Sequence, residues 1–150
     1  MKRYKIGYTT GTFDLFHIGH LNILKKSKEM CDFLIVGVST DEVVQSYKHK
    51  VPVIPFKDRV EIIKSIRYVD QVVPQLSMDK FQAWSELHFD VMFHGDDWKG
   101  SSLYNEYESR LKEVGVEVVY IPHTEGVSSS MLTDKIRKIW KMEHKKNNQC

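Results

Sequence analysis

Apolar residues follow two different spacings along this chain. Continuous apolar, β-branched runs predict buried strands, whereas apolar residues three or four positions apart predict helices. The predicted strands are Tyr4–Thr9, Phe33–Val38, Asp70–Pro74, Val91–His94 and Val116–Ile121. The predicted helices are Ile18–Met30, one starting near Asp41, Lys57–Ile66, Asp79–Leu87, Leu103–Val114 and Met131–Trp140.

Strands and helices alternate over the whole chain, which predicts an α/β fold with a doubly wound parallel sheet. The 150 residues fit one domain over residues 1–140, followed by a polar C-terminal tail at 141–150. We expect the last helix to close the fold with Leu132, Ile136, Ile139 and Trp140 facing inward. In such sheets ligands bind beyond the carboxyl ends of the strands.

Charge and composition narrow the class of protein. The 22 basic and 20 acidic residues nearly cancel, which argues against a nucleic-acid binder. The two cysteines, Cys31 and Cys150, cannot build a disulfide framework or a cysteine metal site. No apolar run approaches the ~20 residues that span a bilayer, and none follows the basic start Met1–Lys5. We therefore expect a cytoplasmic protein that binds no membrane.

The segment after the first predicted strand carries the most distinctive chemistry. It reads Gly11-Thr12-Phe13-Asp14-Leu15-Phe16-His17-Ile18-Gly19-His20, without a P-loop or a dinucleotide fingerprint. Two histidines three residues apart at a helix start can point the same way. The free N–H groups of that helix end suit phosphate, and the glycine lets a ligand approach closely. The alternative is two ordinary histidines, one of which caps the helix.

Five further segments stand near strand ends or loops. Lys48 and Lys50 form a basic loop, Arg67 precedes a strand, and Lys80 starts a helix. Asp96 and Asp97 follow a strand, where carboxylates can bind a base or cap a helix. The serines of 128–130 precede the last helix, where their hydroxyls suit phosphate or simply cap the helix.

Together these segments resemble the HxGH nucleotidyltransferases, and within them the cytidylyltransferases. Gly11–His20 is similar to their HxGH signature, and Arg67-Tyr68-Val69-Asp70 to their R-Y-V-D element. The stretch 95–98 (GDDW) resembles their G-D-D-W element, and 124–130 (TEGVSSS) their T-E-G-I-S-T element. The resemblance implies a Rossmann-like single domain, and the compact bacterial members that use glycerol 3-phosphate are the most similar.

The resemblance also implies a reaction. CMP passes from CTP to a small phosphomonoester, giving a CDP-linked product and pyrophosphate by in-line attack without a covalent intermediate. Glycerol 3-phosphate is the first candidate acceptor, followed by choline or ethanolamine phosphate, and the products would serve cell-wall, capsule or phospholipid synthesis. Mg²⁺ is the expected cofactor, with no assigned protein ligands, and a homodimer is the expected assembly.

Site roles carried over from the resemblance fall into three groups. The catalytic residues are His17, His20, Arg67 and Lys50, with both histidines and Arg67 also binding CTP. The other nucleotide-binding residues are Thr12, Phe13, Asp14, Gly19, Asp97, His123, Thr124, Glu125, Gly126, Val127, Ser128, Ser129 and Ser130. The substrate-binding residues are Lys48, Lys50 and Lys80.

One position departs from the family. His123 stands where the family has arginine, and a histidine near pH 7 is often neutral. We hypothesise that this substitution changes CTP binding or selects a different acceptor. An adenylyltransferase of the same superfamily and a nucleotide-binding regulatory module without activity are the alternatives, although the presence of both histidines argues against the second.

Overall fold

The computed structural model of the chain describes residues 3–147. Its five strands form one parallel sheet in the order β3-β2-β1-β4-β5. The strands are β1 (Tyr4–Gly11), β2 (Cys31–Ser39), β3 (Gln71–Gln75), β4 (Val91–Gly95) and β5 (Glu117–Ile121). The helices are α1 (Ile18–Glu29), α2 (Asp41–Lys48), α3 (Phe56–Lys64), α4 (Lys80–Leu87), the 3₁₀ turn η1 (Asp96–Trp98), α5 (Ser102–Glu113) and α6 (Ser129–Asn147). The predicted α/β fold with a doubly wound parallel sheet is confirmed.

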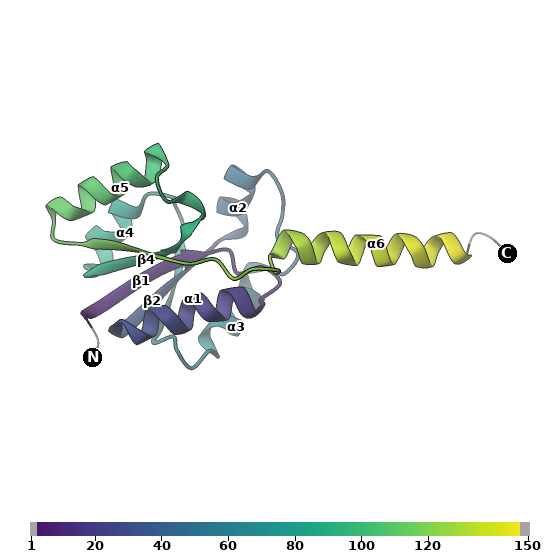
Figure 1. Cartoon of the computed structure of the whole chain (residues 1–150), viewed down its shortest axis with the longest axis horizontal. Helices are drawn as coiled ribbons and strands as arrows, with labels where there is room; N and C mark the ends of the chain where they lie inside the picture. The colour runs from purple at the N-terminus through teal and green to yellow at the C-terminus, as the bar shows by residue number, and fades with distance from the viewer. Residues whose placement is uncertain (1–2, 148–150) are drawn as a thin grey trace.

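Helices cover both faces of the sheet, as Figure 1 shows. Successive strand residues point to opposite faces, so Leu34 and Val36 of β2 join one core cluster and Ile35 joins the other. The first cluster includes Leu24 of α1 and Ile63 of α3. The second includes aromatic and aliphatic side chains of α5 and the neighbouring loops. Burial on both faces explains the continuous apolar runs of the central strands.

The chain reverses its direction of travel across the sheet between β1 and β4. From β1 it moves outward through β2 to β3, and it then returns to place β4 on the other side of β1. The loops that follow β1 and β4 therefore diverge at the carboxyl edge. A crevice at this switch point is where open α/β sheets bind ligands.

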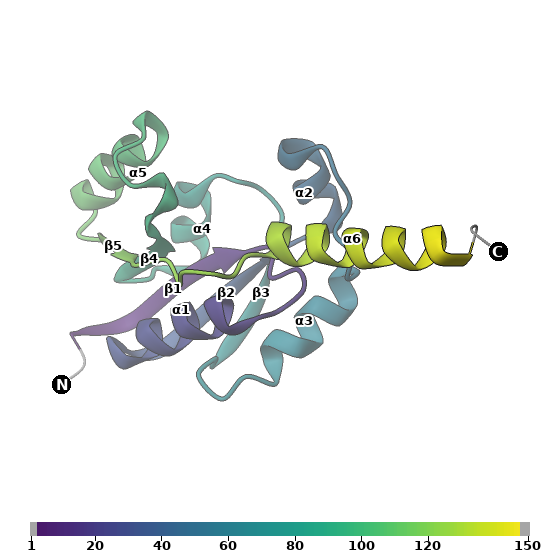
Figure 2. The same cartoon turned by 45° about the vertical axis from the view of Figure 1, so that its right-hand side comes forward.

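Helix α6 does not close the fold, and this corrects our prediction. It runs away from the sheet into solvent in both views (Figures 1 and 2). Its side chains Ile136, Ile139 and Trp140, which we expected to face inward, are more than half exposed. Helical spacing indicates which residues share a face, but it does not say that the rest of the chain covers that face.

The helix also extends further than expected. Residues 141–147, which we assigned to a polar tail, continue α6 as far as Asn147. The remaining tail residues, 148–150 with Cys150, lie outside the described residues, as does the start at 1–2. Within residues 3–147, no helix is both long enough and apolar enough to cross a bilayer.

Candidate active site

A cavity of about 790 Å³ opens at the carboxyl edge of the sheet, beside the switch point. Segments that follow β1, β2 and β4 line it, together with the first turns of α6. Ten of the predicted site residues lie on its walls: Thr12, Phe13, Asp14, His20, Lys48, Lys50, Lys80, Asp97, Ser129 and Ser130. The topology therefore gathers residues that are up to 118 positions apart in the sequence, between Thr12 and Ser130.

The two histidines of the signature cap the start of α1. His17 is the N-cap, and its Nδ1 accepts the Gly19 amide at 3.0 Å. His20 accepts the His17 amide on its own Nδ1 at 3.2 Å. The rings stack with centroids 3.8 Å apart. The two side chains thus form a capping box, a role that serine and glutamate side chains usually fill.

Their position keeps both rings neutral. Burial, and secondarily the neighbouring His17, lower the pKa of His20 to about 3. Burial also lowers the pKa of His17, with a smaller effect from His123. Because a backbone amide can only donate, Nδ1 of each ring must be unprotonated, and the ring proton sits on Nε2. Each imidazole therefore presents an Nε2–H donor at a helix N-terminus, which suits a phosphate oxygen.

Gly19 has a packing role in addition to the ligand-binding role that we predicted for it. A Cβ added there would lie 2.8 Å from Cε1 and 3.0 Å from Nδ1 of His17. The glycine therefore makes room for the imidazole of His17, and its predicted role in letting a ligand approach stays a prediction.

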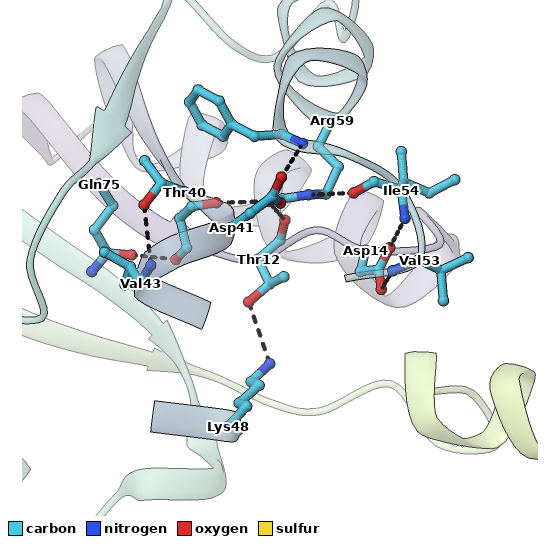
Figure 3. A network of polar contacts seen from close by, with 12 residues as sticks. Thr12, Asp14, Thr40, Asp41, Val43, Lys48, Val53, Ile54, Arg59 and Gln75 are labelled. Atoms are coloured by element: carbon cyan, nitrogen blue, oxygen red, sulfur yellow. Dashed lines mark hydrogen bonds and ion pairs between the residues drawn. The ribbon is translucent and has the colours of Figure 1, made fainter. Parts of the chain in front are cut away.

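The loop between β1 and α1 is strained and clamped. Phe13 and Leu15 have φ values of 55° and 50°, which side chains larger than glycine rarely adopt. The Asp14 carboxylate accepts the amides of Val53 and Ile54 at 2.8 and 2.9 Å (Figure 3). Asp14 therefore orders this loop against the loop after α2, which is one of the two roles we considered for it.

The described residues do not form a protein-built metal site. Within residues 3–147, no group of three or more His, Cys, Asp or Glu side chains converges to hold an ion. The carboxylate of Asp14, our candidate near a metal, accepts backbone amides from Leu15, Val53 and Ile54. The residues at this edge therefore do not fit a metal held by the protein alone.

Three lysines approach the cavity. Lys48 donates to the Thr12 hydroxyl at 3.3 Å, and the Tyr47 hydroxyl lies 3.2 Å from the same oxygen. Lys50 lines the wall with an exposed side chain. Lys80 is only 2% exposed and donates to the Thr10 hydroxyl at 2.6 Å. Burial lowers the pKa of Lys80 to about 8, so its cationic form is costly until an anion arrives.

The segments after β4 and β5 meet beside the cavity. The His123 amide donates to Asp96 at 3.2 Å, and the His123 ring lies 3.9 Å from the Asp97 carboxylate. Thr124 accepts from Asn22 of α1 at 3.0 Å. These contacts place the predicted base-recognition residue Asp97 next to the position that departs from the family pattern.

The serines before α6 have separate roles. Ser128 accepts the Met131 amide at 3.1 Å and so caps the helix. Ser129 donates to the Asp14 carbonyl at 2.5 Å, which ties α6 to the strained loop. Ser130 lines the cavity. Glu125, Gly126 and Val127 form the turn that leads into these serines, with Gly126 at φ 83°.

Arg67 does not reach this site. It precedes β3, at the amino edge of a parallel sheet, whereas His17 and His20 follow the carboxyl end of β1. Its guanidinium donates to the Tyr68 hydroxyl at 2.9 Å on an exposed surface. Proximity to a strand misled the prediction, because only one end of a parallel strand faces the ligand. The structure therefore does not support a catalytic role for Arg67.

A family model described as cytidylyltransferase-like matches residues 8–139, which include all of these segments. The chain belongs to the cytidylyltransferase-like family. Glycerol-3-phosphate cytidylyltransferase of Bacillus subtilis (strain 168) is 39% identical over 129 residues, or 85% of this chain and 94% of the relative. FAD synthase of Pyrococcus horikoshii is 35% identical over 139 residues, or 87% and 90% of the two chains.

A solved structure shares the fold of this cytidylyltransferase-like chain. The lipopolysaccharide core biosynthesis protein from Thermoplasma volcanium GSS1 superposes with a TM-score of 0.68 at 26% identity. The match covers 81% of this chain and 97% of that protein.

Sequence reasoning missed several residues of this cytidylyltransferase-like site. His94 lies between the Gly95 carbonyl at 3.0 Å and the Tyr104 hydroxyl at 2.9 Å, and burial lowers its pKa. Tyr47, Tyr104 and Tyr107 line the same wall. The place of His94 at a strand end was the one available signal. The tyrosines lie on helix faces that looked like ordinary core or surface.

Proposed function

We propose that this chain transfers CMP from CTP to a small phosphomonoester and releases pyrophosphate. The observation that carries the proposal is the pair of neutral, stacked imidazoles at the N-terminus of α1, each with its proton on Nε2. Two such donors can bind the triphosphate and stabilise charge that builds on phosphorus. The family model and the identity to a named cytidylyltransferase support the choice of CTP.

The reaction needs no covalent enzyme intermediate. An oxygen of the acceptor phosphate attacks the α-phosphorus of CTP, and the bond between the α-phosphorus and the bridging oxygen of the β-phosphate breaks. Pyrophosphate leaves with the bond electrons. The protein contributes position and charge stabilisation, which are the main terms in reactions of this kind.

Nucleotide binding uses the β1, β4 and α6 side of the cavity. His20, Thr12 and Phe13 border this space. His17 does not line the cavity but is stacked on His20, and the two imidazoles would donate to the phosphates together. Asp97 would accept from the cytosine amino group. The turn 123–128 and the hydroxyls of Ser129 and Ser130 would face the outer phosphates from the start of α6.

Acceptor binding uses the opposite side, near α2 and α4. Lys80 is buried, and its side-chain nitrogen donates to a neutral hydroxyl, that of Thr10. An incoming phosphate would supply the missing negative charge. Lys48 and Lys50 at the rim would bind phosphate from the other side. Glycerol 3-phosphate is the first acceptor we propose, because that substrate appears in the name of a similar relative.

A phosphorylated amino alcohol is the second acceptor we propose. The wall beside Lys80 is aromatic, since Tyr47, Trp98, Tyr104 and Tyr107 all line the cavity. The hydroxyl of Tyr104 already bonds to His94, and that of Tyr107 bonds to the Met78 carbonyl. Few hydroxyl groups on this wall therefore remain to bond with the hydroxyls of a polyol. Aromatic faces attract ammonium groups, which favours choline or ethanolamine phosphate.

We further propose that Mg²⁺ enters with CTP. The described carboxylates do not gather around an ion, and Mg²⁺ at nucleotide sites is held largely by phosphates and water. When bound, the ion supplies positive charge to the triphosphate.

A homodimer is also proposed. The exposed apolar side chains of α6 support an assembly that covers them. Sedimentation velocity gives the mass in solution, and a monomer at all concentrations would refute the dimer.

A pyrophosphate-release screen tests the activity. The purified chain is incubated with CTP or ATP, Mg²⁺, and glycerol 3-phosphate, choline phosphate or ethanolamine phosphate. We expect release with CTP and one acceptor, and loss of release in the His17→Ala variant. Preference for ATP would replace cytidylyl by adenylyl transfer, and no release with any pair would favour a regulatory nucleotide-binding module.

A further inference from the structure

Arg59 is a fully buried cation that the proposed reaction does not use. It belongs to α3 and is 1% exposed, although helix spacing alone places charged residues on the solvent face. Its guanidinium does not line the cavity. A buried charge is costly unless it is paired and hydrogen-bonded, so its partners indicate what this position does.

Four hydrogen bonds satisfy the guanidinium. Nε donates to the Ile54 carbonyl at 2.8 Å, and one terminal nitrogen donates to the carbonyls of Thr12 and Ser39 at 2.7 and 2.8 Å. The other terminal nitrogen pairs with Asp41 at 2.6 Å. Figure 3 shows Thr12, Asp41 and Ile54 converging on Arg59 from separate parts of the chain.

These partners belong to the segments that border the cavity. Thr12 lies in the strained loop before α1, and Ser39 ends β2. Ile54 ends the loop that carries Lys50. One planar side chain therefore fixes the phosphate loop and the lysine loop relative to each other and to the sheet. The fixed fork of a guanidinium can hold several acceptors at set angles, which an ammonium cannot do.

The contact to Thr12 fixes the orientation of a peptide group. In a trans peptide the N–H of the next residue points opposite to the carbonyl, and no peptide bond of the described residues is cis. Because the Thr12 carbonyl faces Arg59, the Phe13 N–H faces the other way. Phe13 also has a left-handed φ of 55°. Such backbone persists only where its surroundings hold it.

Asp14 forms a second clamp between the same two loops. Its carboxylate accepts the Val53 and Ile54 amides, while Arg59 accepts nothing and donates to the Ile54 carbonyl. The residue Ile54 is therefore held on both sides of its backbone. Because both clamps hold Ile54, loss of the Arg59 bond should also loosen the loop at the amides that Asp14 accepts.

We propose that Arg59 is a positioning residue for phosphate binding. It touches no substrate, and it sets the distance between the histidine loop and Lys50 through the carbonyls of Thr12 and Ile54. This inference rests on the proposed function. Misplacement of reacting groups by a small distance can reduce turnover on the order of a hundredfold.

The Arg59→Lys variant tests the proposal. It keeps the charge but not the fork, so we expect kcat to fall on the order of ten- to a hundredfold with native circular dichroism. The KM for CTP should rise, and hydrogen exchange at the Val53 and Ile54 amides should accelerate while the sheet amides stay protected. Lys28→Gln is the matched control, since it breaks the Lys28–Asp70 ion pair on α1, away from the cavity.

Asp41→Asn separates positioning from charge pairing. It removes the charge of the partner but leaves the three carbonyl bonds of Arg59. The variant should therefore lose stability, because the buried guanidinium is no longer paired with a charge, while the kcat of the folded protein should stay within a few-fold of wild type. A folded Arg59→Lys variant with wild-type kcat, KM and exchange would overturn the proposal. So would an Asp41→Asn variant that loses as much turnover as Arg59→Lys, because the charge pair alone would then explain the effect.

Two further measurements test the proposal if Arg59→Lys does not fold or if the wild-type chain is inactive. Should Arg59→Lys fail to fold, Arg59→Gln at low temperature repeats the exchange measurement, and unchanged protection of Val53 and Ile54 refutes the clamp. If the wild-type chain releases no pyrophosphate, the proposed reaction fails. The positioning claim is then judged by CTP affinity from calorimetry, which Arg59→Lys should weaken on the order of tenfold.

Discussion

His17 and His20 each accept a backbone amide on Nδ1, and their rings lie 25° from parallel with centroids 3.8 Å apart. A protonated ring would carry a hydrogen on Nδ1 and would break its own amide bond. Protonation of both rings would also place two cations face to face across the stack. The helix cap and the phosphate site therefore depend on the same neutral tautomer, which links the stability of α1 to the chemistry of the site.

The first prediction concerns stability against pH. The pKa of His20 is about 3 in the folded chain and near 6.5 when unfolded. The stability that neutral His20 gives the folded chain is therefore fully present above pH 6.5 and is lost as the pH falls toward 3. We expect the free energy of unfolding to fall by up to about 1.4 kcal/mol per pH unit from this group. Urea unfolding at several pH values measures the slope.

Two variants distinguish the contribution of His20 to this pH dependence from that of the carboxylates. His20→Gln should show a shallower fall between pH 6.5 and 5, because glutamine does not titrate. His144→Gln, on the exposed part of α6, should keep the wild-type slope. Equal slopes in wild type and His20→Gln would mean that His20 is not held neutral by the fold.

The second prediction is that Gly19→Ala separates stability from activity. Alanine is the better helix former by about 1 kcal/mol, but displacement of His17 removes a cap bond worth about the same amount, so thermal stability should change little. Its Cβ would displace the His17 ring, which lies 2.8 Å away. We expect turnover to drop on the order of a hundredfold through loss of one phosphate donor. Lys26→Ala, on the exposed face of the same helix, is the control, and an active Gly19→Ala would contradict the role of His17.

The third prediction concerns Lys80. Below its pKa of about 8 the side chain is cationic, and above that value it becomes neutral and attracts phosphate weakly. The kcat/KM for the acceptor should therefore decline as the pH rises past about 8. A pH series at saturating CTP measures this decline.

Replacement of Lys80 provides the matching experiment. Lys80→Met should raise the KM for the acceptor on the order of ten- to a hundredfold, the value of a charged hydrogen bond. The KM for CTP should change much less, whereas Lys112→Met on exposed α5 should alter neither. Equal increases in both KM values would place Lys80 with the nucleotide instead.

The fourth prediction concerns the departure at position 123. His123→Arg should strengthen the contact with Asp97, because arginine keeps its charge at every accessible pH. Exposed pairs contribute up to about 1 kcal/mol, so the KM for CTP should fall by no more than about fivefold. Steady-state kinetics with each acceptor measures the KM for CTP and the acceptor preference. Unchanged CTP affinity and acceptor preference would refute a role for His123 in either.

Much of the fold could be predicted because local patterns determine it. The sheet residues of β2 and β4 are buried on both faces, and their continuous apolar runs show this directly. The course of α6 could not be predicted, since Ile136, Ile139 and Trp140 have the spacing of a buried face. Whether a helix face is covered depends on tertiary packing, and the spacing of apolar residues along the helix does not indicate what packs against it.

The residues of the candidate site could also be predicted only in part. His17, His20 and Asp97 were found because they follow strands whose carboxyl ends meet at one edge. Arg67 follows a helix and lies at the other edge, which sequence proximity to a strand does not distinguish. Arg59 was missed because its importance comes from three backbone carbonyls. Because every residue has a backbone carbonyl, the types of the partner residues do not reveal such bonds.

The projecting course of α6 has a consequence for local unfolding. In the monomer its outer turns pack little against the sheet, so they can open at a small fraction of the cost of unfolding the whole chain. Trypsin should therefore cut first at the exposed Lys135, Lys138 or Lys141. The first turn is different, because Ser129 is bonded to the Asp14 carbonyl. The candidate phosphate site thus lies at the border between a rigid cooperative unit and a segment that melts independently.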